Sequence, residues 1–350
     1  MSQPIPRIII AGTQSGTGKT SLSLALVTSL KRRGLRVQTF KIGPDFLDPS
    51  YLTLASGRPC YNLDGWMTRK EYVLELFSRT TQDADITVIE GVMGLFDGSD
   101  PENSEGSTAE MARWLDAPVL LVVNVHGMAR SLSAVVKGCV EFERGLRLAG
   151  VIANHSGSDR HKDWLRQSLK SASLPPLLGA IPRGVFPTLS SRHLGLTTAD
   201  PQNLPPKILE ELADALERHL SLDAVMEIAK KASPLSMTAP RREETPRPKR
   251  VSIGVAYDKA FHFYYPDNLD ELKLRGCDLI LFSPLQDRTL PDEIDALYFG
   301  GGYPEEYANP LSENREMREA VIQFARRGFP LYAECGGLMY LTQEIETTQG

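Results

Sequence analysis

The N-terminal half of the chain alternates between short apolar runs and longer stretches in which apolar residues recur every three or four positions. The recurrence predicts amphipathic helices, and Leu22, Leu26 and Leu30 form one such stripe that stops at Gly34. Strands are expected at residues 7–11, 37–41, 85–90, 118–125 and 148–154. Helices are expected at residues 19–33, 69–80, 107–115, 129–143 and 159–172. Strands that alternate with helices predict an α/β fold, with a parallel sheet covered on both faces.

The periodic pattern breaks at residues 232–250, where prolines and basic residues replace regularly spaced apolar ones. This composition predicts a linker between a first domain at 1–231 and a second at 251–350. In the second domain we expect strands at 251–256, 278–282, 296–299 and 329–333, and helices at 266–275 and 312–327. Because so few strands precede residue 350, we expect this α/β domain to be incomplete.

The amino-acid composition argues against nucleic-acid binding and against a membrane protein. Of the 350 residues, 41% are hydrophobic and 24% are charged, which is typical of a globular protein with a sizeable core. The net charge of −5 gives no basic excess for nucleic-acid binding, and no apolar run of about 18 residues predicts a membrane span. Four cysteines without CxxC spacing favour a reducing cytoplasm over a disulfide framework.

A glycine-rich loop joins the first strand to the first helix. Such a loop aims backbone N–H groups and the positive end of the helix dipole at a phosphate. Lys19 would reach the terminal phosphates of ATP, and the Thr20 hydroxyl would bind Mg²⁺. The alternative is a strand–helix turn without a ligand. The expected nucleotide-binding residues are Gly12, Thr13, Ser15, Gly16, Thr17, Gly18, Lys19 and Thr20.

Carboxylates follow successive predicted strands of the same domain. Asp45 lies beyond the second strand, Glu90 ends the third, and Asp97 follows it. Loops after the carboxyl ends of parallel strands are where such folds bind ligands, and Mg²⁺ prefers carboxylate and phosphate oxygens. One carboxylate alone would be interpreted as a solvated loop residue or a helix cap. Three of them beside a phosphate loop favour a magnesium-nucleotide site.

Several motifs resemble known families. Gly12 lies one residue further from Gly18 than in the strict P-loop, and this spacing resembles the carboxylate-activating enzymes related to dethiobiotin synthetase. The motifs K-I-G-P-D-F-L-D-P (41–49), N-L-D (62–64), E-G-V-M-G-L-F-D-G (90–98) and S-R-H-L-G-L (191–196) resemble the cobyrinate a,c-diamide synthase family. The resemblance runs from the first strand to the last residue.

This resemblance implies a chemistry and a set of residue roles. The implied activity is ATP-dependent, glutamine-using amidation of the a and c carboxylates of a corrin ring, through an acyl phosphate. Lys41 would stabilise the charge of phosphoryl transfer, Glu90 would hold Mg²⁺ with Thr20, and Asp45 and Asp97 would serve the metal or the activated carboxylate. The resemblance also concerns three further positions. Asn154 is interpreted either as an adenine contact or as an ordinary strand end. His193 is interpreted either as a corrinoid contact or as a structural histidine. Asn124 stands where the family suggests an aspartate.

A cysteine near the C-terminus lies in a strand–turn–helix segment, Phe329 to Gly337. Such a turn exposes a nucleophile, and glycines permit its strained backbone. The upstream glycines of 298–305 offer N–H groups for an oxyanion hole. Together these segments resemble a class I glutamine amidotransferase domain, which implies that Cys335 attacks glutamine and releases ammonia. Gly301, Gly302 and Gly336 are the expected oxyanion residues.

The nucleophile needs a base, and the family places a histidine well after the cysteine. Here no histidine follows His262, which precedes Cys335 and is not given that role. We therefore expect a C-terminally truncated chain with an impaired glutaminase half. Robust release of glutamate from glutamine by these 350 residues would contradict that expectation.

The sequence is also compatible with other functions. The same chemistry could act on hydrogenobyrinate or a nickel sirohydrochlorin, or the chain could resemble cobyric acid synthase, although the motif order favours the a,c-diamide enzyme. A nucleotide-switch ATPase is a more distant alternative, because its second loop lysine is replaced here by Thr13 or Gln14. The expected partners are a corrinoid and L-glutamine or ammonia, and a homodimer is left open.

Overall fold

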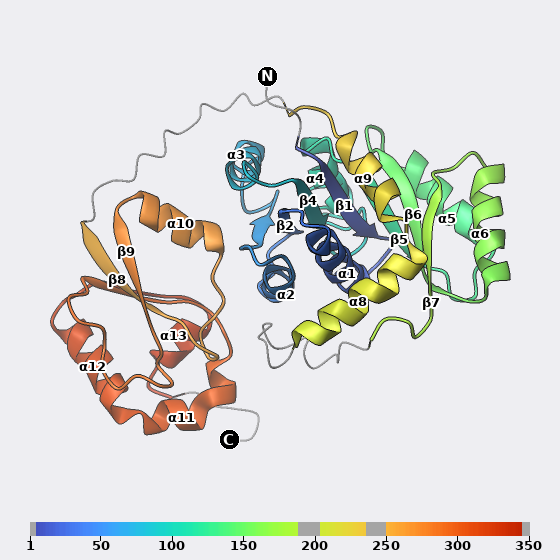
Figure 1. The fold of residues 1–350 in the computed structure, drawn as a ribbon. Helices are drawn as coiled ribbons and strands as arrows, with labels where there is room; N and C mark the ends of the chain where they lie inside the picture. The colour runs from blue at the N-terminus through green and yellow to red at the C-terminus, as the bar shows by residue number, and fades with distance from the viewer. Residues whose placement is uncertain (1–4, 188–203, 236–249, 345–350) are drawn as a thin grey trace. The chain divides into compact units, whose positions relative to one another are not determined.

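The computed structural model describes residues 5–187, 204–235 and 250–344. The chain divides into two compact units, Met1–Arg241 and Arg242–Gly350, and each is a parallel sheet with helices (Figure 1). Most of the predicted linker, residues 236–249, lies outside the described residues, as does the motif at 191–196. Among the described helices, none is both long and apolar enough to cross a bilayer.

The first unit is built on a seven-stranded sheet in the order β3-β2-β4-β1-β5-β6-β7, with every neighbouring pair parallel. The five predicted strands are confirmed. The two outer strands β3 and β7 were not predicted, since β3 has only three residues, too few for a period-two pattern to show. The strands are β1 (Arg7–Gly12), β2 (Val37–Ile42), β3 (Tyr61–Leu63), β4 (Ile86–Glu90), β5 (Val119–Asn124), β6 (Leu148–Ser156) and β7 (Leu177–Pro182).

Alternation along the central strand β1 produces two cores. Ile8 and Ile10 pack into one cluster, and Ile9 and Ala11 into the other, because successive side chains of a strand point to opposite faces. The first cluster includes α1 (Lys19–Arg32), α2 (Leu47–Ser56), α8 (Pro206–His219) and α9 (Leu222–Lys230). The second includes α3 (Lys70–Thr80), α4 (Thr108–Trp114), α5 (Ser131–Glu141) and α6 (Asp159–Ser171).

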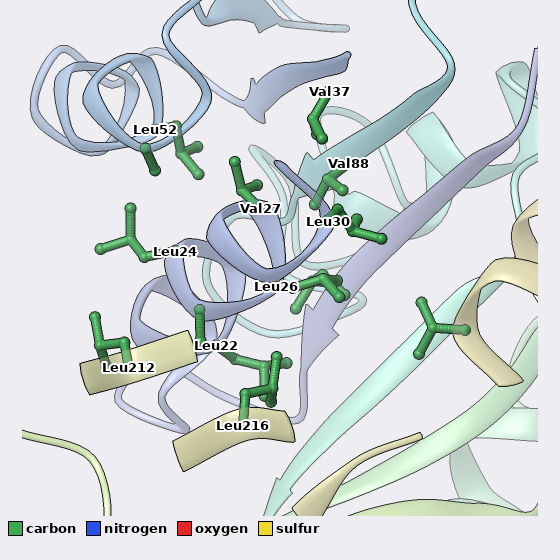
Figure 2. Close-up of a cluster of buried hydrophobic side chains, with 14 of the residues drawn as sticks. Leu22, Leu24, Leu26, Val27, Leu30, Val37, Leu52, Val88, Leu212 and Leu216 are labelled. Atoms are coloured by element: carbon green, nitrogen blue, oxygen red, sulfur yellow. The ribbon is translucent and has the colours of Figure 1, made fainter. Parts of the chain in front are cut away.

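Helix α1 is buried along most of its length between the sheet and α8. Figure 2 shows leucines of α1 gathered with Val88 of β4 and with Leu212 and Leu216 of α8. The sequence pattern does not predict α2, α8 or α9. The burial of α1 fixes the start of this helix, which is where the glycine-rich loop ends.

Arg7 is a buried cation that ties the N-terminal strand to distant segments. Its guanidinium donates to the carbonyl oxygens of Leu115 at 2.7 Å and Ser233 at 2.5 Å. Burial lowers its pKa to about 10. The contact with Ser233 holds the segment after α9 against β1, which local sequence patterns do not reveal.

The second unit has a four-stranded parallel sheet in the order β11-β10-β8-β9. The four predicted strands are confirmed. The helix predicted over 312–327 is present as α12 but begins at Arg315, because Asn314 ends α11 and accepts from the Met317 N–H to cap α12. The Asn314 side chain also donates to the carbonyls of Pro284 and Asp287. The elements are β8 (Val251–Ala256), α10 (Pro266–Leu274), β9 (Cys277–Phe282), β10 (Ala296–Phe299), η1 (Pro304–Tyr307), α11 (Ala308–Glu313), α12 (Arg315–Arg326), β11 (Leu331–Ala333) and α13 (Gly336–Tyr340).

Candidate active site

The glycine-rich loop runs from the end of β1 to the start of α1. Gly16 and Gly18 have φ values of 75° and 93°, a left-handed conformation that glycine adopts without strain. A β-carbon on Gly18 would collide with the side-chain amide of Asn154. That amide donates to the Thr17 carbonyl at 2.9 Å, so the structure brings the predicted Asn154 onto the loop. Its role as an adenine contact stays a prediction.

Lys19, the first residue of α1, extends over the loop toward the end of β4. Its Nζ donates to the Met93 carbonyl at 2.5 Å and to the Gln14 carbonyl at 3.3 Å. Burial and the charge of Lys41 lower its pKa. The cation therefore lies between the glycine-rich loop and the 90–98 motif, where it could meet the phosphates of a nucleotide.

Lys41 is the centre of a buried cluster of charges. Its Nζ lies 2.5 Å from Asp48 Oδ2, 3.0 Å from Glu90 Oε1 and 3.8 Å from Asp45 Oδ2. Burial alone would lower the pKa of Lys41, but the charges of Glu90, Asp48 and Asp45 raise it overall. The ammonium group thus stays charged among three carboxylates, which are provided by the end of β4 and by the segment after β2.

Asp48 was missed as a site residue, although it lies in the quoted 41–49 motif. It is the carboxylate nearest to Lys41 Nζ, and Lys41 lowers its pKa against the opposing effect of burial. Asp45 also accepts from the N–H groups of Leu47 and Asp48 at the start of α2. Burial and Asp48 raise the pKa of Asp45. The Asp-x-x-Asp spacing over one helical turn is the signal that could have identified the pair.

Glu90 connects this cluster to the glycine-rich loop. Its Oε1 accepts from Thr20 Oγ1 at 2.7 Å as well as from Lys41 Nζ at 3.0 Å. The side chain is fully buried, and burial raises its pKa to about 7. Its other oxygen, Oε2, is buried and has no hydrogen-bond partner in the described part of the chain.

Asp97 lies in the loop after β4 but takes no part in the Lys41 cluster. Its Oδ2 accepts from the Gly94 N–H at 2.8 Å, which closes a tight turn. The Leu95 N–H donates to the Gly12 carbonyl at 2.8 Å, so this turn packs on the glycine-rich loop. Asp97 itself is exposed beside that loop.

Cys335 occupies a sharp turn between β11 and α13 in the second unit. Its φ of 49° and ψ of −120° are strained for a residue with a side chain, and the residue is exposed. Gly301 lies against it, because a β-carbon there would be 3.3 Å from Cys335 Sγ. A β-carbon on Gly336 would be 2.8 Å from the Gly302 carbonyl oxygen, so the structure gathers the three predicted oxyanion glycines around the cysteine.

Three further side chains stabilise the Cys335 turn and the glycine segment that follows β10. The sequence did not single them out. The hydroxyl of Tyr264 accepts from the Gly300 N–H at 2.8 Å and donates to the Ala256 carbonyl. The hydroxyl of Tyr298 donates to Glu334 Oε1 at 2.6 Å. Since Glu334 directly precedes Cys335, these bonds tie the end of β10 to the turn.

His262 is not placed as the base of Cys335. Among the described residues, neither of its ring nitrogens has a recorded hydrogen-bond partner, and its ring packs against Phe263 and Tyr303. Burial lowers its pKa.

Gly337 should be intolerant of a side chain. A β-carbon there would collide with the Phe299 carbonyl, so we expect Gly337→Ala to destabilise the second unit by about 1–3 kcal/mol. Hydrogen exchange of the β10 and β11 amides would measure the loss. Gly138→Ala is the control, because that position lies inside α5 with nothing within 4 Å of the added carbon. Equal exchange in Gly337→Ala and in the unsubstituted chain would contradict the collision.

Comparisons with known proteins identify two domain types in the chain. Residues 8–196 match the family described as the CobQ/CobB/MinD/ParA nucleotide binding domain. Residues 252–350 match the CobB/CobQ-like glutamine amidotransferase domain. The first match contains the glycine-rich loop and the Lys41 cluster, and the second contains Cys335.

Proteins named cobyrinate a,c-diamide synthase are similar along almost the whole chain. The one from Syntrophotalea carbinolica is 59% identical over 348 residues, which cover 99% of this chain and 75% of that protein. The one from Leptospira interrogans is 46% identical over 100% of this chain and 76% of its own length. The one from Archaeoglobus fulgidus is 43% identical over 99% and 75%.

Proposed function

Because the chain belongs to the cobyrinate a,c-diamide synthase family, we propose that its first unit uses ATP to phosphorylate carboxylates of cobyrinate before ammonia converts them to amides. The family and the two domain types make the chain a ligase that uses glutamine as the amide donor in cobalamin biosynthesis. ATP, the acyl phosphate and the identity of the acceptor are the finer parts of the proposal.

The observation that carries the proposal is the meeting of two groups on one buried oxygen. Thr20 Oγ1 from the glycine-rich loop and Lys41 Nζ from β2 both contact Glu90 Oε1, at 2.7 and 3.0 Å. The contact links the expected phosphate site to a fixed cation. Phosphoryl transfer needs mainly positioning and charge stabilisation, and this arrangement can provide both.

The residues present fit Mg²⁺ in the way that nucleotide sites usually bind it. Glu90 Oε2 is a buried carboxylate oxygen without a hydrogen-bond partner among the described residues, and Oε1 of the same carboxylate accepts from the Thr20 hydroxyl. Both the carboxylate and the hydroxyl are hard oxygen ligands. Within the described residues, no group of three or more His, Cys, Asp or Glu side chains could hold a metal by itself. Phosphate oxygens and water would complete the coordination. When bound, the ion would neutralise phosphate charge.

The proposed reaction has two steps, phosphoryl transfer to the carboxylate and amide formation. A carboxylate oxygen of the acceptor attacks the γ-phosphorus of ATP, the bond from that phosphorus to the bridging oxygen breaks, and ADP leaves. Lys19 and Lys41 would stabilise the charge that moves onto the phosphate oxygens. Ammonia then attacks the acyl carbon, inorganic phosphate leaves, and the nitrogen loses a proton. Asp45 and Asp97 remain proposed contacts of the metal or of the carboxylate.

In the reaction of the family the second unit would supply that ammonia from glutamine, and the expectation that these 350 residues release little glutamate stays a prediction. Cys335 Sγ would attack the side-chain amide carbon of glutamine, and the N–H groups near Gly301, Gly302 and Gly336 would stabilise the developing oxyanion. Ammonia leaves, and water hydrolyses the γ-glutamyl thioester to glutamate and the free thiol. The ordering of the turn by Glu334 and Tyr298 supports the assignment.

The proposal is tested by supplying ammonia, Mg²⁺-ATP and cobyrinate, since ammonia bypasses the glutamine step. We expect one ADP for each amide formed, and mass spectrometry with isotopically labelled ammonia should show up to two labels in the corrinoid product. Parallel reactions with hydrogenobyrinate and nickel sirohydrochlorin test the alternative acceptors. ATP turnover that no tetrapyrrole stimulates would refute the proposal and favour the nucleotide-switch alternative.

Two further parts of the proposal concern the surroundings of the protein. The four cysteines are all free thiols in the structure, in keeping with the cytoplasmic location proposed from the sequence. The corrinoid and glutamine are the proposed small-molecule partners, and a homodimer stays an untested prediction.

A further inference from the structure

We propose that residues Trp66 to Lys70, called here the Trp66 turn, form a binding surface for the acceptor macrocycle. The ligand class is a flat tetrapyrrole-derived ring that carries carboxylates on its rim. Apolar side chains of the turn would contact the ring face, and cations would meet the carboxylates that are not being amidated. This inference rests on the proposed function and assigns the acceptor a place on the first unit.

The turn leaves the sheet at the edge where the reactive groups lie. It follows β3, which is parallel to β2 in the register Lys41–Asn62. The Asn62 side-chain amide donates to the carbonyl oxygens of Gly43 and Asp45 at 2.8 and 2.7 Å. Asn62 lies four residues before Trp66. The end of β3 is therefore bonded directly to the loop that carries Asp45.

The other side of the turn packs against the segment that follows Asp97. A β-carbon on Gly65 would be 2.6 Å from Glu110 Oε2, and the same carboxylate oxygen accepts from the Gly106 N–H at 2.8 Å. A β-carbon on Gly106 would be 3.6 Å from that of Trp66. The Trp66 turn thus lies between the segments that carry the two proposed carboxylate contacts, Asp45 and Asp97.

The backbone of the turn is fixed, whereas its apolar side chains are exposed. Asp64 is buried, and its Oδ1 accepts from the N–H groups of Trp66 and Met67, each at 2.8 Å. Nevertheless the Trp66 side chain is 65% exposed and Met67 is 47% exposed. A large aromatic side chain on a fixed backbone beside a reactive site is suited to an apolar planar ligand, because the backbone loses little conformational entropy on contact.

Two cations follow the apolar pair. Arg69 precedes the first residue of α3, Lys70 begins that helix, and both side chains are exposed. Glu71, the next residue, is exposed and acidic, so residues 66–71 together carry an excess of one positive charge. Long cationic side chains beside an apolar platform are complementary to a macrocycle whose ring is apolar and whose rim is anionic.

The test measures binding of cobyrinate to the whole chain by equilibrium dialysis, read by the visible absorbance of the corrinoid. Trp66→Ala and the double variant Arg69→Ala/Lys70→Ala should each raise the Kd for cobyrinate roughly tenfold. The matched controls are Trp164→Ala, an exposed tryptophan on α6, and Arg166→Ala/Lys207→Ala on exposed helix surfaces. The controls should bind cobyrinate as the unsubstituted chain does.

Two further measurements separate a binding role from general damage. All variants should bind Mg²⁺-ATP with unchanged affinity, and added salt should weaken cobyrinate binding less in Arg69→Ala/Lys70→Ala than in the unsubstituted chain. If the turn variants bind cobyrinate as tightly as the controls while the unsubstituted chain amidates it, this inference alone is overturned. If the unsubstituted chain amidates no corrinoid with ammonia, the proposed function fails and this inference with it.

Discussion

Lys41→Met is expected to destabilise the first unit by about 3–5 kcal/mol and to remove ammonia-dependent amidation. The substitution deletes the cation that contacts Asp45, Asp48 and Glu90, of which Glu90 is fully buried. Uncompensated buried charges are costly, so the loss should exceed that from any surface ion pair. All three tryptophans of the chain lie in this unit, and their fluorescence in a denaturant titration would report its unfolding alone.

Two variants make this prediction specific. In Lys41→Met/Asp48→Asn one of the orphaned charges is neutralised, so we expect part of the lost stability to return while amidation stays absent. Lys137→Met removes a cation from an exposed pair with Glu141 at 3.8 Å and should leave the unfolding midpoint within experimental error. A Lys41→Met protein that unfolds at the same denaturant concentration as the unsubstituted chain would show that the cluster does not stabilise the fold.

The second large effect is expected on catalysis rather than on stability. Lys19→Ala should lower kcat for ammonia-dependent amidation about 10²–10³-fold, because it deletes a cation aimed at the expected phosphate position. The rate of ADP formation in the presence of cobyrinate is the measurement. The fold should survive, since within the described residues the hydrogen bonds of the Lys19 side chain go to the carbonyls of Gln14 and Met93.

Lys31 offers a matched control on the same helix. It lies in the last turn of α1, and its Nζ donates to the Ala55 carbonyl at 3.4 Å, away from the glycine-rich loop. Lys31→Ala should leave kcat and the KM for ATP unchanged. Equal rates for Lys19→Ala and Lys31→Ala would contradict the assignment of the loop as the phosphate site.

The features that the sequence determined are local in the chain. The glycine-rich loop could be read directly, because the strand, the glycines, Lys19 and the helix follow one another without interruption. The strand–helix alternation likewise predicted the parallel sheet of the first unit and the α/β class of the second, since a period of two or of 3.6 residues needs only neighbouring positions. The strained turn at Cys335 was predicted from the adjacent glycines in the same way.

The tertiary structure decided which of the candidate groups meet. The sheet order puts β4 between β2 and β1, which separates strands that are consecutive in sequence and brings Glu90 between Lys41 and Thr20. The fold of the segment after β2 makes Asp48, rather than Asp45, the closest partner of Lys41, and the turn after β4 leaves Asp97 outside that cluster. Distances between such residues depend on strand order and register.

The same reason explains what local patterns missed. The three-residue strand β3 shows no period of its own, yet its pairing with β2 places the Trp66 turn beside the Asp45 loop. Tyr264 reaches the Gly300 N–H across 36 positions, and no spacing rule connects them. The sequence therefore determined the chemical groups and their local geometry, whereas long-range strand pairing decided how they combine into a site, because its free energy comes from contacts between distant segments.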